Sequence, residues 1–204
     1  MPPLKEINEM KKIIAAILGK AGSGKDTLLN KICAERKDYN RIINCTTRSK
    51  RSGEKDGVDY YFLTPDDFVA KIMDGDMLEV STFNDWYYGT MKSSLKEGIN
   101  IGIFNPESFD CLLQILSSEN VEIVSFFLDC SDKERLIRQL RREEEPDIDE
   151  IIRRYQADKI DFYDENLLEV NEFLPSDNLQ DLKHNITFIQ NYLDEKIKIL
   201  DKTI

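Results

Sequence analysis

A short apolar run that ends in a glycine-rich turn constrains the fold of this chain more than any other feature. Residues 11–19 read KKIIAAILG, which is typical of a parallel strand buried on both faces. Residues 25–37, KDTLLNKICAERK, then carry apolar side chains at helical spacing. Between the two lies GKAGSGK, residues 19–25. A strand, a glycine-rich turn of this spacing and a helix, in this order, predict a phosphate-binding loop.

The loop supplies several kinds of group that attract phosphate. Gly22 and Gly24 allow the backbone to turn its N–H groups inward, and the helix that begins near Lys25 adds the positive end of its dipole. Lys25 offers a mobile positive charge to the β- and γ-phosphates. We therefore expect ATP to bind here as phosphoryl donor. The expected ATP-binding residues are Gly19, Gly22, Ser23, Gly24, Lys25, Asp26 and Thr27.

Asp26 departs from the usual form of this loop, which has Ser or Thr at that position to ligate Mg²⁺. Three interpretations are open. Asp26 can act as a metal-side ligand, because a carboxylate also binds Mg²⁺ or one of its waters. It can be a helix-start acid that points away from the phosphates. It can mark a loop that no longer turns over ATP. We predict Mg²⁺ as cofactor with Asp26 as its protein ligand, and Thr27 keeps one hydroxyl at the start of the helix.

The rest of the chain alternates between strand and helix patterns. Further strands are predicted over 41–45, 99–104, 121–129 and 169–174, and helices over 64–75, 106–118, 132–144, 148–166 and 178–200. This alternation predicts an α/β protein with a parallel five-stranded core sheet flanked by helices. Residues 1–12 are expected to form a polar N-terminal arm.

Composition excludes some functions and locations. The chain has 204 residues and a formal net charge of −11, which argues against nucleic acid as a partner. No apolar run approaches the length of a membrane span, and we expect a cytoplasmic protein with no membrane partner. The four cysteines show no paired close spacing, which favours reduced thiols. Because His184 is the only histidine, we expect chemistry that needs no histidine base.

A second anion site is predicted from a basic island in this acidic chain. Between Arg41 and Gly53 there are four basic residues and no acidic one. Arg48 and Arg51 can offer bidentate forks to a phosphate, and the phenolic groups of Tyr60 and Tyr88 can donate to the same oxygens.

The same region carries a resemblance to a known family. Residues 46–62 read TTRSKRSGEKDGVDYYF, and residues 75–90 read GDMLEVSTFNDWYYGT. These stretches closely resemble the guanylate kinase family in their Thr-Thr-Arg, Gly-Glu, Asp-Gly-x-Asp-Tyr-x-Phe and Tyr-Tyr-Gly-Thr elements, and the likeness extends from residue 13 to about residue 95. It implies the fold of the P-loop kinases and one domain over 13–204. The core would lie at 13–45 and 91–204, with a monophosphate-binding insertion at 46–90 and a helical lid at about 138–153.

The resemblance also implies roles for individual residues. Arg48, Arg51, Tyr60 and Tyr88 would hold the phosphate of a nucleoside monophosphate. Glu79 would accept hydrogen bonds from guanine and Thr90 would line the same pocket. Asn44 stands where the family usually has Ser: its amide can donate to the guanine O6, although a flipped amide accepts instead.

Arginines in the predicted lid complete the implied catalytic set. Together with Lys25, the catalytic residues would be Arg138, Arg142 and Arg153, with Arg141 and Arg154 as near alternatives. The competing interpretation is that these arginines pair with glutamates on the faces of two helices.

One departure from the family concerns the metal. The family carries Asp-x-Asp after its third strand, where this chain has Phe104, Asn105 and Pro106. We hypothesise that the metal-side carboxylate has moved to Asp26; the loop Gly-Lys-Asp-Thr is similar to that of some viral deoxynucleoside monophosphate kinases. The implied reaction is phosphoryl transfer from ATP to GMP or dGMP by a monomer or homodimer. Two alternatives are open: a kinase for another deoxynucleoside monophosphate, and a non-catalytic module that binds a protein.

Overall fold

The computed structural model describes residues 12–202, except for 52, 84, 117–120, 143 and 164–168. The polar arm expected over residues 1–12 lies outside the described residues apart from Lys12, which begins the first strand. Within the described ranges, no helix combines the length and the apolar character needed to cross a membrane.

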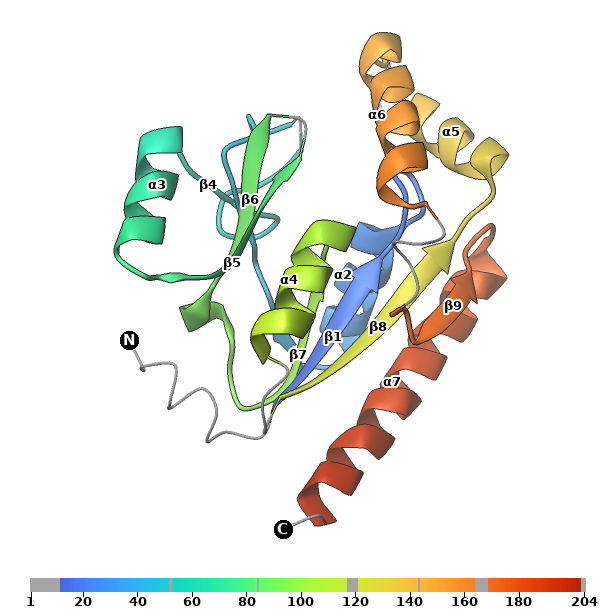
Figure 1. The fold of residues 1–204 in the computed structure, drawn as a ribbon. Coiled ribbons are helices and arrows are strands. Elements are labelled where there is room, and N and C mark those ends of the chain that lie inside the picture. Colours follow the sequence, from blue (N-terminus) through green and yellow to red (C-terminus); the bar gives the residue numbers. More distant parts are fainter. Residues whose placement is uncertain are drawn as a thin grey trace. The chain divides into compact units, whose positions relative to one another are not determined.

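The predicted α/β class and the parallel five-stranded sheet are confirmed (Figure 1). The strands follow the order β2-β7-β1-β8-β9. Their bounds are Asn40–Arg41 for β2, Gly98–Ile103 for β7, Lys12–Leu18 for β1, Val121–Asp129 for β8 and Glu172–Pro175 for β9. Every residue of β1 is buried, as expected for a parallel strand covered on both faces.

Helices occupy the predicted segments, with somewhat different ends. They are α2 (Lys25–Glu35), α3 (Pro65–Met73), α4 (Pro106–Leu116), α5 (Asp132–Leu140), α6 (Ile148–Asp161) and α7 (Leu179–Lys202). Side chains cap several of them: Thr64, Ser131, Asp147 and Asn178 accept hydrogen bonds from the first-turn N–H groups of α3, α5, α6 and α7. The helices α5 and α6 end earlier than the sequence pattern indicated, at Leu140 and Asp161.

A second, four-stranded sheet was not predicted. Its order is β4-β3-β6-β5, with β3 at Cys45–Thr46, β4 at Tyr61–Phe62, β5 at Met77–Phe83 and β6 at Trp86–Met91, and the short 3₁₀ helix η1 (Lys92–Ser94) follows it. The expectation of one strand over 41–45 was wrong. Arg41 pairs with Ile101 of β7, whereas Cys45 pairs with β4 and β6, because the chain changes sheets between these residues.

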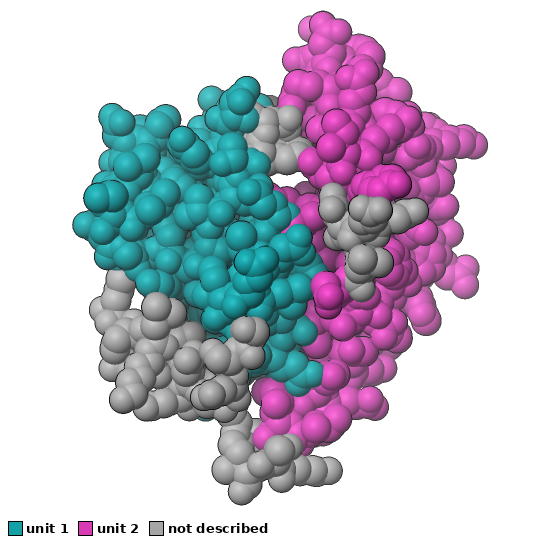
Figure 2. All heavy atoms as spheres, in the orientation of Figure 1, with its two compact units in different colours: residues 1–14, 38–102, 107–123 teal, residues 15–37, 103–106, 124–204 magenta. Residues whose placement is uncertain are grey.

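The chain forms two compact units, coloured separately in Figure 2. Unit 1 comprises residues 1–14, 38–102 and 107–123, and unit 2 comprises residues 15–37, 103–106 and 124–204. The expected monophosphate-binding region 46–90 lies wholly in unit 1, whereas the predicted phosphate-binding loop and lid lie in unit 2. The expected core, 13–45 and 91–204, is divided between the units, so the single domain over 13–204 stays a prediction.

Candidate active site

The loop between β1 and α2 adopts the backbone conformation that its glycines permit. Gly19, Gly22 and Gly24 have φ values of 148°, 82° and 97°, which side chains rarely tolerate. At Gly22 a Cβ atom would also collide with the carbonyl oxygen of Arg135. Gly24 is the N-cap of α2, so the unpaired N–H groups of the first helical turn lie at the end of the loop. The loop therefore has the form of an anion cradle.

Lys25 lies across this cradle. Its Nζ donates to the carbonyl oxygens of Gly19 at 2.5 Å and Lys20 at 3.1 Å. Burial lowers the pKa of Lys25, and the carboxylates of Asp26 and Asp158 partly oppose the shift. A phosphate that enters the loop would meet a lysine already positioned there, with its charge held by two carbonyls.

Asp26 and Thr27 occupy the exposed first turn of α2. No group of three or more His, Cys, Asp and Glu side chains that could hold a metal occurs in the described part of the chain. Mg²⁺ usually takes one or two carboxylates and completes its shell with phosphate oxygens and water. A single exposed carboxylate beside a phosphate cradle fits that pattern, so Asp26 can hold Mg²⁺ only together with a nucleotide.

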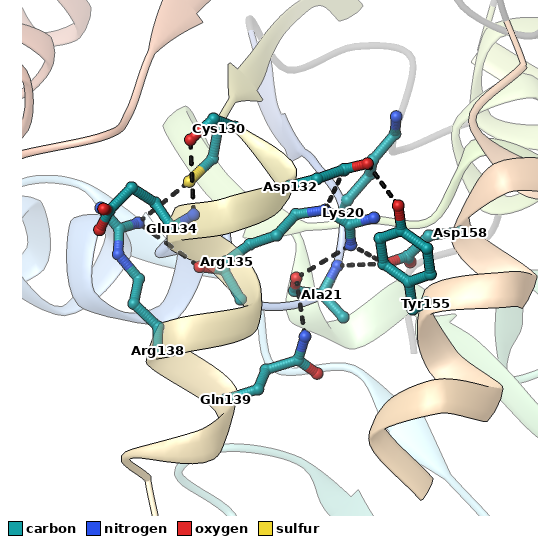
Figure 3. Close-up of polar contacts among 12 residues, drawn as sticks. Lys20, Ala21, Cys130, Asp132, Glu134, Arg135, Arg138, Gln139, Tyr155 and Asp158 are labelled. Atoms are coloured by element: carbon teal, nitrogen blue, oxygen red, sulfur yellow. Dashed lines mark hydrogen bonds and ion pairs between the residues drawn. The ribbon is translucent and has the colours of Figure 1, made fainter. Parts of the chain in front are cut away.

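The rear of the loop is held by buried side chains of α5 and α6 (Figure 3). The Ala21 N–H donates to Asp158 Oδ2 at 2.9 Å, while the Ala21 carbonyl accepts from Arg135 Nη1 and Gln139 Nε2, both at 3.4 Å. Arg135 is fully buried and also donates to Asp158 Oδ2 at 2.5 Å. Both peptide groups that flank the Ala21 Cα are thereby fixed.

Asp132 and Tyr155 complete the surroundings of Arg135. Arg135 Nε donates to Asp132 Oδ1 at 2.8 Å, and its guanidinium lies 4.6 Å from the centre of the Tyr155 ring. The Tyr155 hydroxyl donates to Asp132 Oδ2 at 2.5 Å. This bond and the one from Arg135 lower the pKa of Asp132.

Arg138, one of the predicted lid arginines, also bonds to the loop (Figure 3). Its Nη1 lies 3.4 Å from the Gly22 carbonyl oxygen and 3.3 Å from that of Ser23, and its Nη2 donates to the Ser176 carbonyl at 2.7 Å. The Ser176 hydroxyl donates to the Ser23 carbonyl at 2.7 Å. In this structure Arg138 therefore contacts loop carbonyls, and its contact with a transferred phosphoryl group stays a prediction.

The other predicted lid arginines lie apart from these contacts. Arg142 is exposed, just beyond the end of α5. Arg153 donates twice to Glu150, with N···O distances of 2.7 and 2.8 Å. That pairing is the helix-face ion pair that was the competing interpretation, and the catalytic roles of Arg142 and Arg153 remain predictions.

In unit 1, strand register gathers the residues predicted to bind the monophosphate. Glu79 pairs with Thr90 and Ser81 with Tyr88 across β5 and β6. Since side chains alternate along a strand, these four lie on one face. Gly89, between Tyr88 and Thr90, has no room for a side chain, because a Cβ atom would lie 2.8 Å from the Glu79 carbonyl oxygen. The close approach of β5 and β6 thus depends on this glycine.

Asn44, Glu79 and Thr90 form a polar cluster. The Thr90 hydroxyl lies 2.7 Å from Glu79 Oε1 and 3.1 Å from Asn44 Oδ1. Burial raises the pKa of Glu79 to about 7, although hydrogen bonds from Thr90 and Ser108 oppose the shift. Oδ1 is the Asn44 amide atom that lies beside the Thr90 hydroxyl, so the Nδ2 group, a hydrogen-bond donor, is turned away from that hydroxyl. The cluster offers a donor and a carboxylate to a ligand base.

Arg48, Tyr60 and Tyr88 form a second cluster in the same unit. Arg48 is buried, and its guanidinium lies 5.5 Å from the centre of the Tyr60 ring, which meets Tyr88 edge-on at 6.1 Å. The Arg48 fork binds both carboxylate oxygens of Glu54, at 3.0 and 2.8 Å. The backbone N–H of Arg51 donates to the same carboxylate at 2.8 Å. Arg51 is thus joined to the cluster through Glu54.

Three participants were missed from the sequence. Glu54 lies in the quoted Gly-Glu element, but no role was given to it. Arg135 carried a usable signal, because it stands three residues before Arg138 on the same face of α5. No sequence pattern pointed to Asp158, because its partner Ala21 is 137 residues away in the chain.

Comparison with known proteins decides the family. The family model described as guanylate kinase matches residues 9–186. This chain belongs to the guanylate kinase family. Among relatives in that family, the guanylate kinase of Mycoplasma genitalium is 32% identical over 162 residues, and that of Fusobacterium nucleatum is 34% identical over 132 residues.

The match to individual relatives is partial. It covers 77% of this chain and 66% of the M. genitalium protein, and 61% of this chain and 68% of the F. nucleatum protein. The chain thus spans about two thirds of the length of these relatives. A crystal structure of guanylate kinase from Anaplasma phagocytophilum superposes with a TM-score of 0.65 at 17% identity, covering 92% of this chain and 87% of that chain. That likeness supports the fold.

Proposed function

We propose that the protein is a kinase that transfers the γ-phosphoryl group of ATP to GMP or dGMP. The observation that carries this proposal is the cluster of Asn44, Glu79 and Thr90, which offers guanine an amide donor and a buried carboxylate on the unit that also holds Arg48. A hydrogen-bonding site of this kind rejects bases that would leave its buried groups unpaired. Membership of the guanylate kinase family supports the same substrate.

Each cluster would have a distinct task. The 19–25 loop and Lys25 would bind the phosphates of ATP, and Arg48, Arg51, Tyr60 and Tyr88 would bind the phosphate of the acceptor. The attacking oxygen is already an anion, so no general base is required. Rate enhancement would come from positioning and charge stabilisation around a loose transition state, with Arg138, Arg142 and Arg153 as the proposed lid arginines.

We propose that Mg²⁺ accompanies ATP and that Asp26 is its protein ligand. Bound Mg²⁺ would neutralise charge on the transferred phosphoryl group. Asp26 would hold the ion or one of its waters at the first turn of α2, where the usual hydroxyl residue is absent.

We further propose a cytoplasmic location, because all four cysteines are free thiols. A monomer or a homodimer would suit the reaction, and nucleotides would be the partners.

A coupled assay of ADP release tests the function. ATP and Mg²⁺ are supplied with GMP, dGMP, AMP, dTMP or CMP in turn. We expect turnover with GMP or dGMP and little with the other three. Turnover with dTMP but not dGMP would overturn the role of Glu79, and turnover with none would favour the non-catalytic module.

A further inference from the structure

We propose that Arg135 and Asp158 are positioning residues of the ATP site, which set the direction of the loop N–H groups without touching the nucleotide. The inference rests on the proposed function only in naming ATP as the ligand. Its basis is that side chains of α5 and α6 form hydrogen bonds with the backbone of the loop (Figure 3).

Three successive loop carbonyls accept hydrogen bonds on this rear side. That of Ala21 accepts from Arg135 and Gln139, that of Gly22 from Arg138, and that of Ser23 from Arg138 and Ser176. Arg135, Arg138 and Gln139 lie at i, i+3 and i+4 on α5, so one face of this helix supplies most of the donors.

Because these carbonyl groups are held, the N–H groups of the same peptide bonds are held in a fixed direction as well. In a trans peptide the C=O of one residue and the N–H of the next point in opposite directions, and no cis bond occurs among the described residues. The N–H groups of Gly22, Ser23 and Gly24 therefore point away from α5. Ser23 N–H donates to the Lys20 carbonyl, whereas those of Gly22 and Gly24 bond to no other described residue. Such convergent N–H groups make an anion site.

Asp158 holds the peptide group between Lys20 and Ala21, which precedes these three. Its Oδ2 accepts from the Ala21 N–H at 2.9 Å and from Arg135 Nη1, so one carboxylate oxygen ties the loop, α5 and α6 together. The side chains of Arg135 and Asp158 are 0% and 6% exposed. Gly22 leaves no space between the loop and α5, since a side chain there would strike the Arg135 carbonyl.

Stability alone does not account for a buried ion pair at this position. An apolar pair of similar volume is often as stabilising as a buried ion pair, or more so. Moreover, Arg135 Nη2 is buried without a hydrogen-bond partner in the described structure, which is a cost that an apolar side chain would avoid. What the ion pair adds is two directional contacts to the Ala21 peptide groups.

The double variant R135L/D158L tests the proposal, because it removes both charges at once and leaves neither unpaired. We expect it to remain folded, and its Kd for Mg-ATP to rise about tenfold or more, as for the loss of hydrogen bonds to charged groups. The KM for GMP should change little, since the monophosphate cluster lies in the other unit.

The matched control is R36L/D194L. Arg36 and Asp194 form a bidentate ion pair, with both N···O distances at 2.8 Å, between the C-cap of α2 and α7. Arg36 lies at the C-terminal end of α2, whereas the 19–25 loop leads into the N-terminal end of this helix. We expect the Kd for Mg-ATP of R36L/D194L to equal that of the unmodified protein. An equal Kd in R135L/D158L would overturn the proposal.

Amide NMR gives a readout independent of turnover. On titration with ADP, the Gly22 and Gly24 amide signals should shift in the unmodified protein and shift much less in R135L/D158L. If the double variant does not fold, Asp158→Ala serves instead, because it removes the oxygen that accepts from the Ala21 N–H while Arg135 keeps its ion pair with Asp132. Full ATP affinity in Asp158→Ala would contradict the proposal. Failure of the unmodified protein to bind ATP would refute the proposed function, which separates the two outcomes.

Discussion

The hydroxyl oxygen of Thr90 lies 2.7 Å from Oε1 of Glu79, directly across the β5–β6 ladder, and both side chains are buried. An acid held in such a place costs stability when it ionises, although the proposed recognition of guanine requires its ionised form. The first two predictions concern this conflict.

Glu79→Gln should remove a pH dependence of stability. Burial raises the pKa of Glu79 to about 7 from an ordinary 4.5. Between these values the folded protein holds a proton that the unfolded chain has released, so the free energy of unfolding falls as pH rises and levels off above about 7. The difference is about 3 kcal/mol at 1.36 kcal/mol per pKa unit. Urea unfolding at pH 5 and pH 8 measures it, with the exposed Glu144→Gln as control.

The same ionisation should control substrate affinity. The Glu79 side chain can accept from both guanine N–H groups at once only when it is deprotonated, because protonation turns one of its oxygens into a donor. The KM for GMP should therefore fall as pH rises through about 7. Steady-state kinetics at saturating ATP would show this fall. A KM that stays constant from pH 6 to pH 8 would contradict guanine recognition by Glu79.

Arg48→Lys should impair acceptor binding selectively. Lysine keeps the charge but loses the planar fork that binds both oxygens of Glu54. Loss of one hydrogen bond to a charged group should raise the Kd for GMP about tenfold, with little change in the Kd for ATP. Isothermal titration with each nucleotide separates the two effects. An equal loss of affinity for both nucleotides would point to general unfolding.

Gly22→Ala should be far more harmful than Gly75→Ala. Both glycines have positive φ, 82° and 70°, so alanine costs about 1–2 kcal/mol of backbone strain at either position. At Gly75 a Cβ atom meets nothing within 4 Å, whereas at Gly22 it collides with the Arg135 carbonyl oxygen. Gly75→Ala should therefore lower the midpoint of thermal unfolding by only a few degrees and leave ATP binding unchanged, whereas Gly22→Ala should strongly reduce both stability and ATP binding.

Asp26→Ala should alter the metal requirement more than nucleotide binding. If Asp26 is the protein ligand of Mg²⁺, the Mg²⁺ concentration for half-maximal turnover rises and kcat falls, while ATP binding measured in EDTA is retained or strengthened. A Mg²⁺ titration of turnover checks this, and Asp149→Asn, an exposed acid in the first turn of α6, is the control. Unchanged turnover in Asp26→Ala would refute the metal role.

Much of the five-stranded sheet could be predicted because its strands are apolar runs. The segment 121–129 was predicted with the bounds that β8 has. The hairpin of β5 and β6 was missed because its inward face carries Glu79, Ser81 and Thr90, which are polar and buried. A buried face made of polar residues lacks the apolar alternation that reveals an ordinary strand.

The candidate site was predictable to a similar degree. Residues that belong to a local motif, such as Arg48 and Tyr60, could be named from the sequence, and the structure brings them together. The pairing of Arg135 with Asp158 joins two helices to a distant loop, and no local pattern encodes it. The split of 41–45 between two sheets likewise depends on tertiary pairing.

The ion pair between Arg48 and Glu54 has a consequence for selectivity among anions. The Arg48 guanidinium already binds the Glu54 carboxylate. Any anion that binds the same N–H groups must therefore displace Glu54 or share these donors with it. The net free energy of anion binding is then the free energy of the new ion pair minus that of the Arg48–Glu54 pair. Monovalent ions such as chloride, which form no bidentate contact, would lose that exchange, whereas a phosphate dianion would compete with Glu54 and release its carboxylate from Arg48 and Arg51.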